Sequence, residues 1–85
     1  MNEIDGILKK FKNTAFLCKA NEEYRHIVCE STVDLVRIDI SIPKREIIVS
    51  TPKEYRWLYK NDMEELERFL TTNFRGYRIS FRYYG

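Results

Sequence analysis

The sequence predicts a single α+β domain over residues 1–85, with helices packed on one face of a mainly antiparallel sheet. Three patterns predict it: a helical apolar stripe near the start, strict apolar–polar alternation between residues 34 and 42, and a second helical stripe followed by a final alternating segment. A chain of 85 residues is long enough for one hydrophobic core and too short for two. The expected element order is α-β-β-β-β-α-β.

Residues 3–12 are predicted to form the first helix, because four apolar side chains recur with helical spacing, at Ile4, Ile7, Leu8 and Phe11. Asn2 is the expected N-cap, and the acids that follow it favour a helix start. The next four elements are predicted strands over residues 14–20, 24–30, 34–42 and 46–50. The third has the clearest alternation, with Val36, Ile38, Ile40 and Ile42 on one face.

Thr51 and Pro52 predict the start of the second helix, with threonine as N-cap, proline at the first helical position and Glu54 completing a capping box. Its apolar stripe continues to about residue 72, with Tyr55, Leu58 and Tyr59 expected to face the core. A second cap near Asn61 leaves open whether this segment is one helix or two. Residues 77–84 alternate again and predict the last strand, which is expected to lie at a sheet edge.

The two cysteines, Cys18 and Cys29, are predicted to be buried free thiols on the inner face of the first hairpin. A disulfide between them is geometrically conceivable. We expect no metal site and no cofactor, because His26 is the sole histidine and no CxxC pair is present. With no nucleophile–base pair and no phosphate-binding loop, we expect no catalytic residues and no enzymatic activity.

The formal net charge of +2 is too balanced to indicate a nucleic-acid-binding protein by itself. The sequence shows no secretory signal, no lipidation motif and no apolar run of roughly 20 residues, so we expect no membrane association and a cytoplasmic location. Alanine is scarce and isoleucine frequent, which is typical of AT-rich genomes. Many phages, low-GC bacteria and archaeal viruses have such genomes, and the leading interpretation is a phage, viral or mobile-element protein that works in the host cytoplasm.

The last strand combines three arginines with aromatic residues and has no acid. Arg75, Gly76, Tyr77 and Phe81 look like the ribonucleoprotein signature of RNA-recognition motifs, but Arg78 and Ile79 depart from that signature and the predicted element order differs from that fold. We therefore do not assign the chain to that family. By alternation, Arg78, Arg82 and Tyr84 face outward from the sheet.

The predicted outer face also receives apolar residues that have no place in the core, so it is expected to form a patch of Leu17, Tyr24, His26, Val28, Leu35 and Arg37 beside the arginines. Trp57 lies off the helix stripe and is either an exposed anchor or a core residue. The leading hypothesis is a non-catalytic protein-binding module, an inhibitor or adaptor that docks sterically. Its expected binding residues are Leu35, Arg37, Trp57, Arg75, Arg78, Arg82 and Tyr84. The alternative is binding of single-stranded RNA or DNA through the last strand. A homodimer through the outer face or the last strand is compatible with both.

Overall fold

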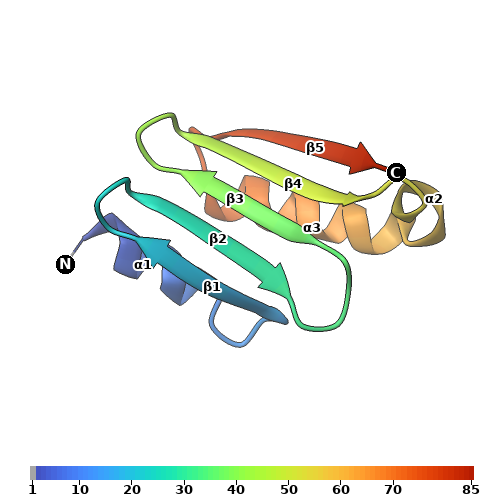
Figure 1. The fold of residues 1–85 in the computed structure, drawn as a ribbon, viewed down its shortest axis with the longest axis horizontal. Helices are drawn as coiled ribbons and strands as arrows, with labels where there is room; N and C mark the ends of the chain where they lie inside the picture. Colours follow the sequence, from blue (N-terminus) through green and yellow to red (C-terminus); the bar gives the residue numbers. More distant parts are fainter. Residues whose placement is uncertain (1) are drawn as a thin grey trace.

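The computed structural model describes residues 2–85 and has the predicted α+β architecture, with a five-stranded sheet and helices on one of its faces (Figure 1). The elements are, in chain order, α1 (Glu3–Lys10), β1 (Phe16–Asn21), β2 (His26–Ser31), β3 (Arg37–Ser41), β4 (Glu46–Pro52), α2 (Tyr55–Leu58), α3 (Lys60–Asn73) and β5 (Arg78–Tyr84).

The sheet order follows the sequence order, β1-β2-β3-β4-β5. The first four strands form an antiparallel meander, whereas β5 pairs in parallel with β4 after the crossover through α2 and α3. The prediction that the last strand lies at a sheet edge is confirmed, and β1 forms the other edge. Figure 1 shows α1 and α3 behind the sheet, so the opposite face is open.

The first helix begins as predicted. The Asn2 Oδ1 atom accepts a hydrogen bond from the Asp5 N–H at 2.9 Å and so caps α1. The helix ends at Lys10, with Phe11 as its C-cap, two residues before the predicted end. Ile4, Ile7 and Phe11 are buried, as the apolar stripe predicts.

Most strand boundaries differ from the predicted ones by one to three residues, and at two of them side chains fix the loop beside the strand. The Ser31 Oγ atom accepts hydrogen bonds from the Val33 and Asp34 N–H groups at 3.2 and 3.0 Å, so the chain forms a loop there and β3 starts only at Arg37. In the first hairpin, the Asn21 Oδ1 atom accepts from the Tyr24 N–H at 3.0 Å. The turn is therefore longer than the predicted polar break, and β2 starts at His26.

The prediction that Thr51 and Pro52 start the second helix is wrong. Both residues belong to β4, opposite Tyr83 and Tyr84 of β5. The Thr51 side chain is fully buried, and its hydroxyl donates to the Leu35 carbonyl at 3.0 Å instead of capping a helix. This long-range hydrogen bond overrides the local capping signal.

The helical segment after β4 consists of two helices, α2 and α3. Of the two alternatives left open by the sequence, one helix or two, the second is therefore correct. Tyr59, with φ −124° and ψ 42°, separates α2 from α3, two residues before the expected position at Asn61. The break changes which side chains face the core. Leu58 and Tyr59 are exposed rather than buried, which corrects their predicted placement, and Tyr55 is half-buried.

The core lies between the covered face of the sheet and the two long helices. Its fully buried apolar side chains come mainly from the three inner strands, with one each from the β3–β4 turn and α3: Ile27, Cys29, Ile38, Ile40, Ile42, Ile47, Val49 and Leu70. Phe11 connects the two helices, because its ring centroid lies 5.5 Å from that of Phe69 and 5.9 Å from that of Phe74. The same ring lies 5.9 Å from Phe16 of β1, so Phe11 joins three elements.

Cys18 and Cys29 form a disulfide, so the prediction of free thiols is wrong. The two residues are directly opposite each other in the β1–β2 register, with their Cα atoms 4.0 Å apart. The bond joins the edge strand β1 to β2, one of the three inner strands that supply the core. Disulfides are typical of oxidising compartments. This one weighs against the expected cytoplasmic location, which stays a prediction.

Candidate protein-binding site

Five large apolar side chains are exposed at one end of the sheet, and we call them the apolar end: Val33, Leu35, Trp57, Leu58 and Tyr84, each 54% to 73% exposed. They come from the β2–β3 loop, α2 and the last residue of β5. The topology brings them together, because the β2–β3 loop and the carboxyl ends of β4 and β5 lie at the same end of the sheet (Figure 1). Apolar side chains exposed at the same end of a fold are a candidate interaction surface.

Hydrogen bonds hold the three parts of the apolar end together. The Tyr55 hydroxyl of α2 accepts from the Leu35 N–H at 3.4 Å, and the buried Thr51 hydroxyl donates to the Leu35 carbonyl. The Lys53 N–H donates to the Tyr84 carbonyl at 2.8 Å. Leu35 is thus tied to α2 and β4, and Tyr84 to the segment that leads into α2. The exposed side chains are presented on a connected backbone.

A groove of about 280 Å³ runs from the apolar end onto the open sheet face. It contains three of the residues predicted to bind a partner, and its full lining is Glu30, Ser31, Asp34, Leu35, Val36, Arg37, Ser50 and Tyr84. Arg82 borders it, because Arg37 and Arg82 lie opposite Ser50 from its two sides. The groove therefore combines apolar side chains with charges of both signs.

Trp57 belongs to the same end of the molecule. Of the two alternatives for this residue, the structure shows the exposed one, with 61% of the side chain accessible. Its helix has four residues and buries none of them, so nothing in the fold of residues 2–85 covers the indole. Arg56 beside it lies over the ring of Tyr83, with its guanidinium carbon 5.1 Å from the ring centroid, and this contact fixes α2 against β5.

Two predicted binding residues lie elsewhere. Arg75 is exposed in the turn after α3, and Arg78 starts β5, about 20 Å from Tyr84 at the usual rise of a strand. The Arg78 Nη2 atom lies 2.9 Å from the Glu46 Oε2 atom. This hydrogen bond from Arg78 is the main cause of a lowered pKa at Glu46. Arg78 shares the open face with Arg82 and Tyr84, as predicted, but at the opposite end.

The middle of the open face is polar. Asp39 is half-buried there and accepts two hydrogen bonds from Arg37, from Nε at 3.1 Å and from Nη2 at 3.2 Å. These bonds and the negative charge of Asp39 raise the pKa of Arg37. His26 also lies near this carboxylate, with Nε2 3.7 Å from Oδ1.

The predicted apolar patch across the open face is divided into two parts. Leu17 and Val28 line one groove near the β1 edge, whereas Leu35 lies in the groove beside the apolar end. Most of the exposed large apolar side chains lie at the apolar end, where two members were missed by sequence reasoning. Leu58 matched the predicted core stripe, and only the helix break shows otherwise. Val33 had a usable signal, because it stands alone between polar residues in a loop.

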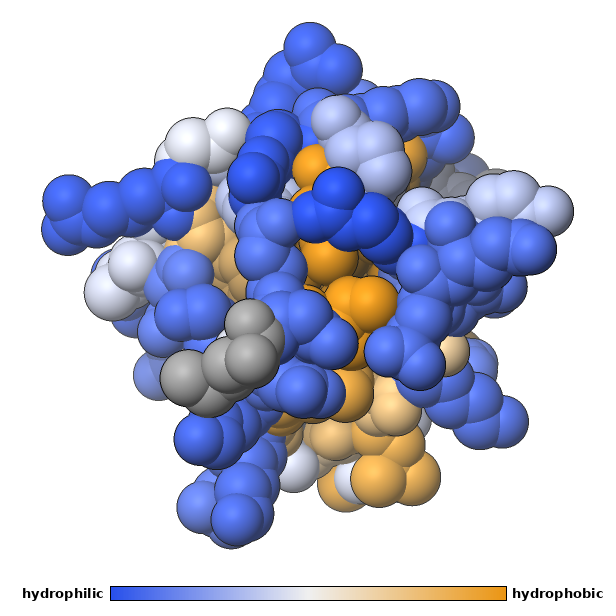
Figure 2. Space-filling view, turned by 90° about the vertical axis from the view of Figure 1, so that its left-hand side faces the viewer, coloured by the Kyte–Doolittle hydropathy of each residue, from blue (hydrophilic) through white to orange (hydrophobic). Residues whose placement is uncertain are grey.

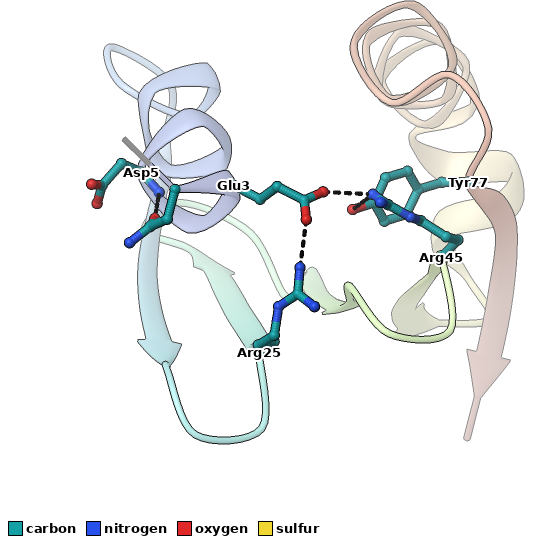
Figure 3. Close-up of polar contacts among 6 residues, drawn as sticks. Glu3, Asp5, Arg25, Arg45 and Tyr77 are labelled. Atoms are coloured by element: carbon teal, nitrogen blue, oxygen red, sulfur yellow. Dashed lines mark hydrogen bonds and ion pairs between the residues drawn. The ribbon is translucent and has the colours of Figure 1, made fainter.

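The opposite end of the molecule is mostly hydrophilic (Figure 2). Here Glu3 of α1 receives Arg25 from the β1–β2 turn and Arg45 from the β3–β4 turn, where the Arg45 Nη1 atom lies 2.7 Å from the Glu3 Oε2 atom (Figure 3). Arg45 also donates to the Tyr77 hydroxyl at 3.1 Å. The hydrogen bond from Arg45 lowers the pKa of Glu3 most, and the charges of Arg45 and Arg25 add to this shift.

Replacement of Glu3 with glutamine should make the protein less stable near neutral pH and little different from wild type in acid. The folded-state pKa of Glu3 lies below the ordinary value of 4.5, so ionised Glu3 stabilises the fold above that pH. Its contribution disappears as the pH falls through the lowered pKa. Melting temperatures across this range should converge, and added salt should reduce the difference at neutral pH. Glu65→Gln on the exposed side of α3 is the control, and parallel curves for Glu3→Gln would contradict the expectation.

Within residues 2–85 there is no helix with the length and apolar character needed to cross a membrane. Nor do three or more His, Cys, Asp or Glu side chains of this range come together as a metal site would require. The chain matches no protein-family model, no curated protein and no solved structure.

Proposed function

We propose that the chain is a protein-binding module that docks a partner on its apolar end and the adjoining groove. The observation that carries this proposal is the gathering of exposed apolar side chains from three separate elements at one end of the sheet. A partner that covers them would remove apolar surface from water, which is the main favourable term in most protein association.

The chemistry of the apolar end suits a protein partner. Trp57 and Tyr84 are of the types that most often dominate binding energy, and Arg37 and Arg82 add polar groups at the rim. The arginines alone would also attract nucleic acid. However, Arg37 is paired with Asp39 and Arg78 with Glu46, so the open face offers phosphates much less net positive charge than its arginine content indicates.

The proposed mechanism is steric, with no chemical step. A module of this size can block a partner's surface, as an inhibitor, or join two proteins, as an adaptor. The compositional bias of the sequence supports an origin in a phage, virus or mobile element, and the partner would then be a host protein.

Replacing Leu35 with aspartate and Trp57 with alanine should weaken partner binding by about 30-fold, the effect of losing roughly 2 kcal/mol at a binding hot spot. Both side chains are exposed, so the folded domain should survive the double substitution. The full chain would be used to capture proteins from cells of its source, and the affinity of the captured protein would then be measured by calorimetry.

The control is Arg75→Glu, at the opposite end of the molecule. Binding that survives in the Arg75 variant and is lost in the Leu35 and Trp57 variant supports the proposal. Equal binding by all three folded proteins contradicts it. Capture of nucleic acid, with an affinity that falls steeply as salt increases, would overturn the proposal in favour of a nucleic-acid-binding protein.

A further inference from the structure

The edge of β1 has unpaired backbone groups available to another strand (Figure 1). The 4.0 Å spacing of the Cys18 and Cys29 Cα atoms identifies them as a non-hydrogen-bonded pair of the antiparallel ladder. The Thr32 N–H donates to the Ala15 carbonyl at 2.8 Å, which sets the same alternation. The N–H and C=O groups of Cys18 and Ala20 therefore point away from β2, towards the open edge.

An apolar groove of about 500 Å³ lies beside this edge, between β1 and α1. Leu8 of α1 and Phe16 of β1 supply apolar surface to it, and the disulfide forms part of its wall. A strand added to β1 would place every second side chain on this side of the sheet. The groove is thus positioned to receive side chains from an added strand.

The groove beside this edge has more positive than negative charge, with Lys9 and Lys12 against one acid, Asp5. Lys19 is exposed on the other face of β1, where it shares a groove with Glu30. None of the three lysines belongs to an ion pair formed among residues 2–85. Their ammonium groups are therefore available to carboxylates of a ligand.

From these observations we propose that the edge of β1 is a second binding site, which takes an extended, acidic segment of a partner protein by strand addition. Backbone hydrogen bonds to Cys18 and Ala20 would supply affinity, apolar side chains would enter the groove, and carboxylates would meet the lysines. The site is separate from the apolar end and does not depend on the function proposed for that end.

The charge pattern selects this edge and this occupant. The groove beside the other edge strand, β5, has Arg56 and Lys60 facing Glu64 and Glu67, so its charges cancel and it favours neither an acidic nor a basic ligand. A second copy of the chain paired symmetrically about Lys19 is also disfavoured, because the two copies of this lysine would lie directly opposite each other.

The disulfide contributes by fixing the strand that receives the ligand. None of the six residues of β1 is fully buried, and only Phe16 and Cys18 are half-buried. Packing alone therefore holds β1 weakly, and the covalent bond to β2 keeps its edge in an extended conformation before a ligand arrives. Such preorganisation lowers the conformational cost of binding.

A synthetic heptapeptide of sequence Glu-Thr-Val-Thr-Val-Thr-Glu, which as a strand carries two valines flanked by two glutamates on one face, is a direct probe of the full chain. We expect its titration to shift the amide resonances of Cys18 and Ala20 and to slow their hydrogen exchange. Two peptides are controls, one with lysine in place of glutamate and one N-methylated at every second amide so that one of its edges cannot form backbone hydrogen bonds. Each should bind at least about 10-fold more weakly, because the lysine peptide loses the carboxylates that meet the protein's lysines and the N-methylated peptide loses backbone hydrogen bonds.

Two protein variants complete the test. Lys9→Gln with Lys12→Gln should weaken binding of the glutamate peptide about 10-fold, whereas Lys53→Gln with Lys60→Gln removes the same charge elsewhere and should leave it unchanged. Ala20→Pro removes an outward N–H without breaking the β1–β2 ladder, and should also weaken binding.

Equal effects of the two lysine pairs, equal binding of the N-methylated peptide, or shifts confined to β5 would each overturn the proposal. So would light scattering that shows a dimer dissociated by Ala20→Pro. Because the peptide and the Lys9, Lys12 and Ala20 variants avoid the apolar end, failure here leaves the proposed function standing, and the reverse also holds.

Discussion

Replacement of both Cys18 and Cys29 with alanine should lower the free energy of unfolding by about 3 kcal/mol, the amount expected for a bond that closes a loop of this size. The two residues are separated by 11 positions in the sequence. For a domain of this length, such a loss is a large fraction of the total stability. Urea denaturation followed by circular dichroism would measure it.

Removal of the disulfide should destabilise β1 before it destabilises the rest of the fold. Without the disulfide, hydrogen exchange should accelerate first in β1, whose side chains are mostly exposed, and last in β3 and β4. Wild-type protein in a reducing agent serves as a second sample and should behave like the double variant. Equal stability of all samples, together with two titratable thiols in the untreated protein, would show that the cysteines are not joined in solution.

The second large effect is expected at Phe11. Phe11→Ala should cost about 3–5 kcal/mol, as truncation of a buried aromatic side chain usually does. The reason is the position of the ring, which is 4% exposed and contacts rings of β1, α3 and the segment after α3. Its loss would open a cavity at the point where α1 meets α3, and thermal unfolding would report the change.

Two further variants serve as controls for the Phe11→Ala measurement. Phe11→Leu keeps much of the volume and should retain the fold even where alanine abolishes it. Leu17→Ala removes an apolar side chain that is 70% exposed, and its effect should stay within about 0.5 kcal/mol. A Phe11→Ala variant as stable as Leu17→Ala would mean that α1 is not packed against α3.

The element order and most strands could be predicted from the sequence, because local patterns determine them. Alternation between Val36 and Ile42 reflects one buried sheet face, and the Asn2 cap acts within a single turn of helix. The Thr51 signal failed because its hydroxyl bonds to Leu35, 16 residues away, and no local rule contains that contact. The helix break was left open by the capping signal near Asn61, and the structure places it at Tyr59.

The candidate site was only partly predictable for the same reason. Alternation places Arg78, Arg82 and Tyr84 on one face, but it does not say which of them share an end with a loop from another part of the chain. Leu35 and Tyr84 line one groove because β5 runs parallel to β4, and that direction follows from the crossover rather than from any motif. The sequence allowed Cys18 and Cys29 to lie opposite each other, as they do, but their oxidation state also depends on the redox compartment, and the free-thiol prediction assumed a cytoplasmic one.

The parallel pairing of β5 also has a consequence for synthesis of the chain on the ribosome. Each of β2, β3 and β4 can pair with the strand made just before it, whereas β5, the second neighbour of β4, emerges only after two helices. Until then β4 is an edge strand, although it is an inner strand in the finished sheet. Its centre is the apolar run Ile47, Ile48 and Val49, which is prone to pair with strands of other chains while it has no partner. The nascent chain is therefore most prone to aggregate between the release of β4 and the docking of β5.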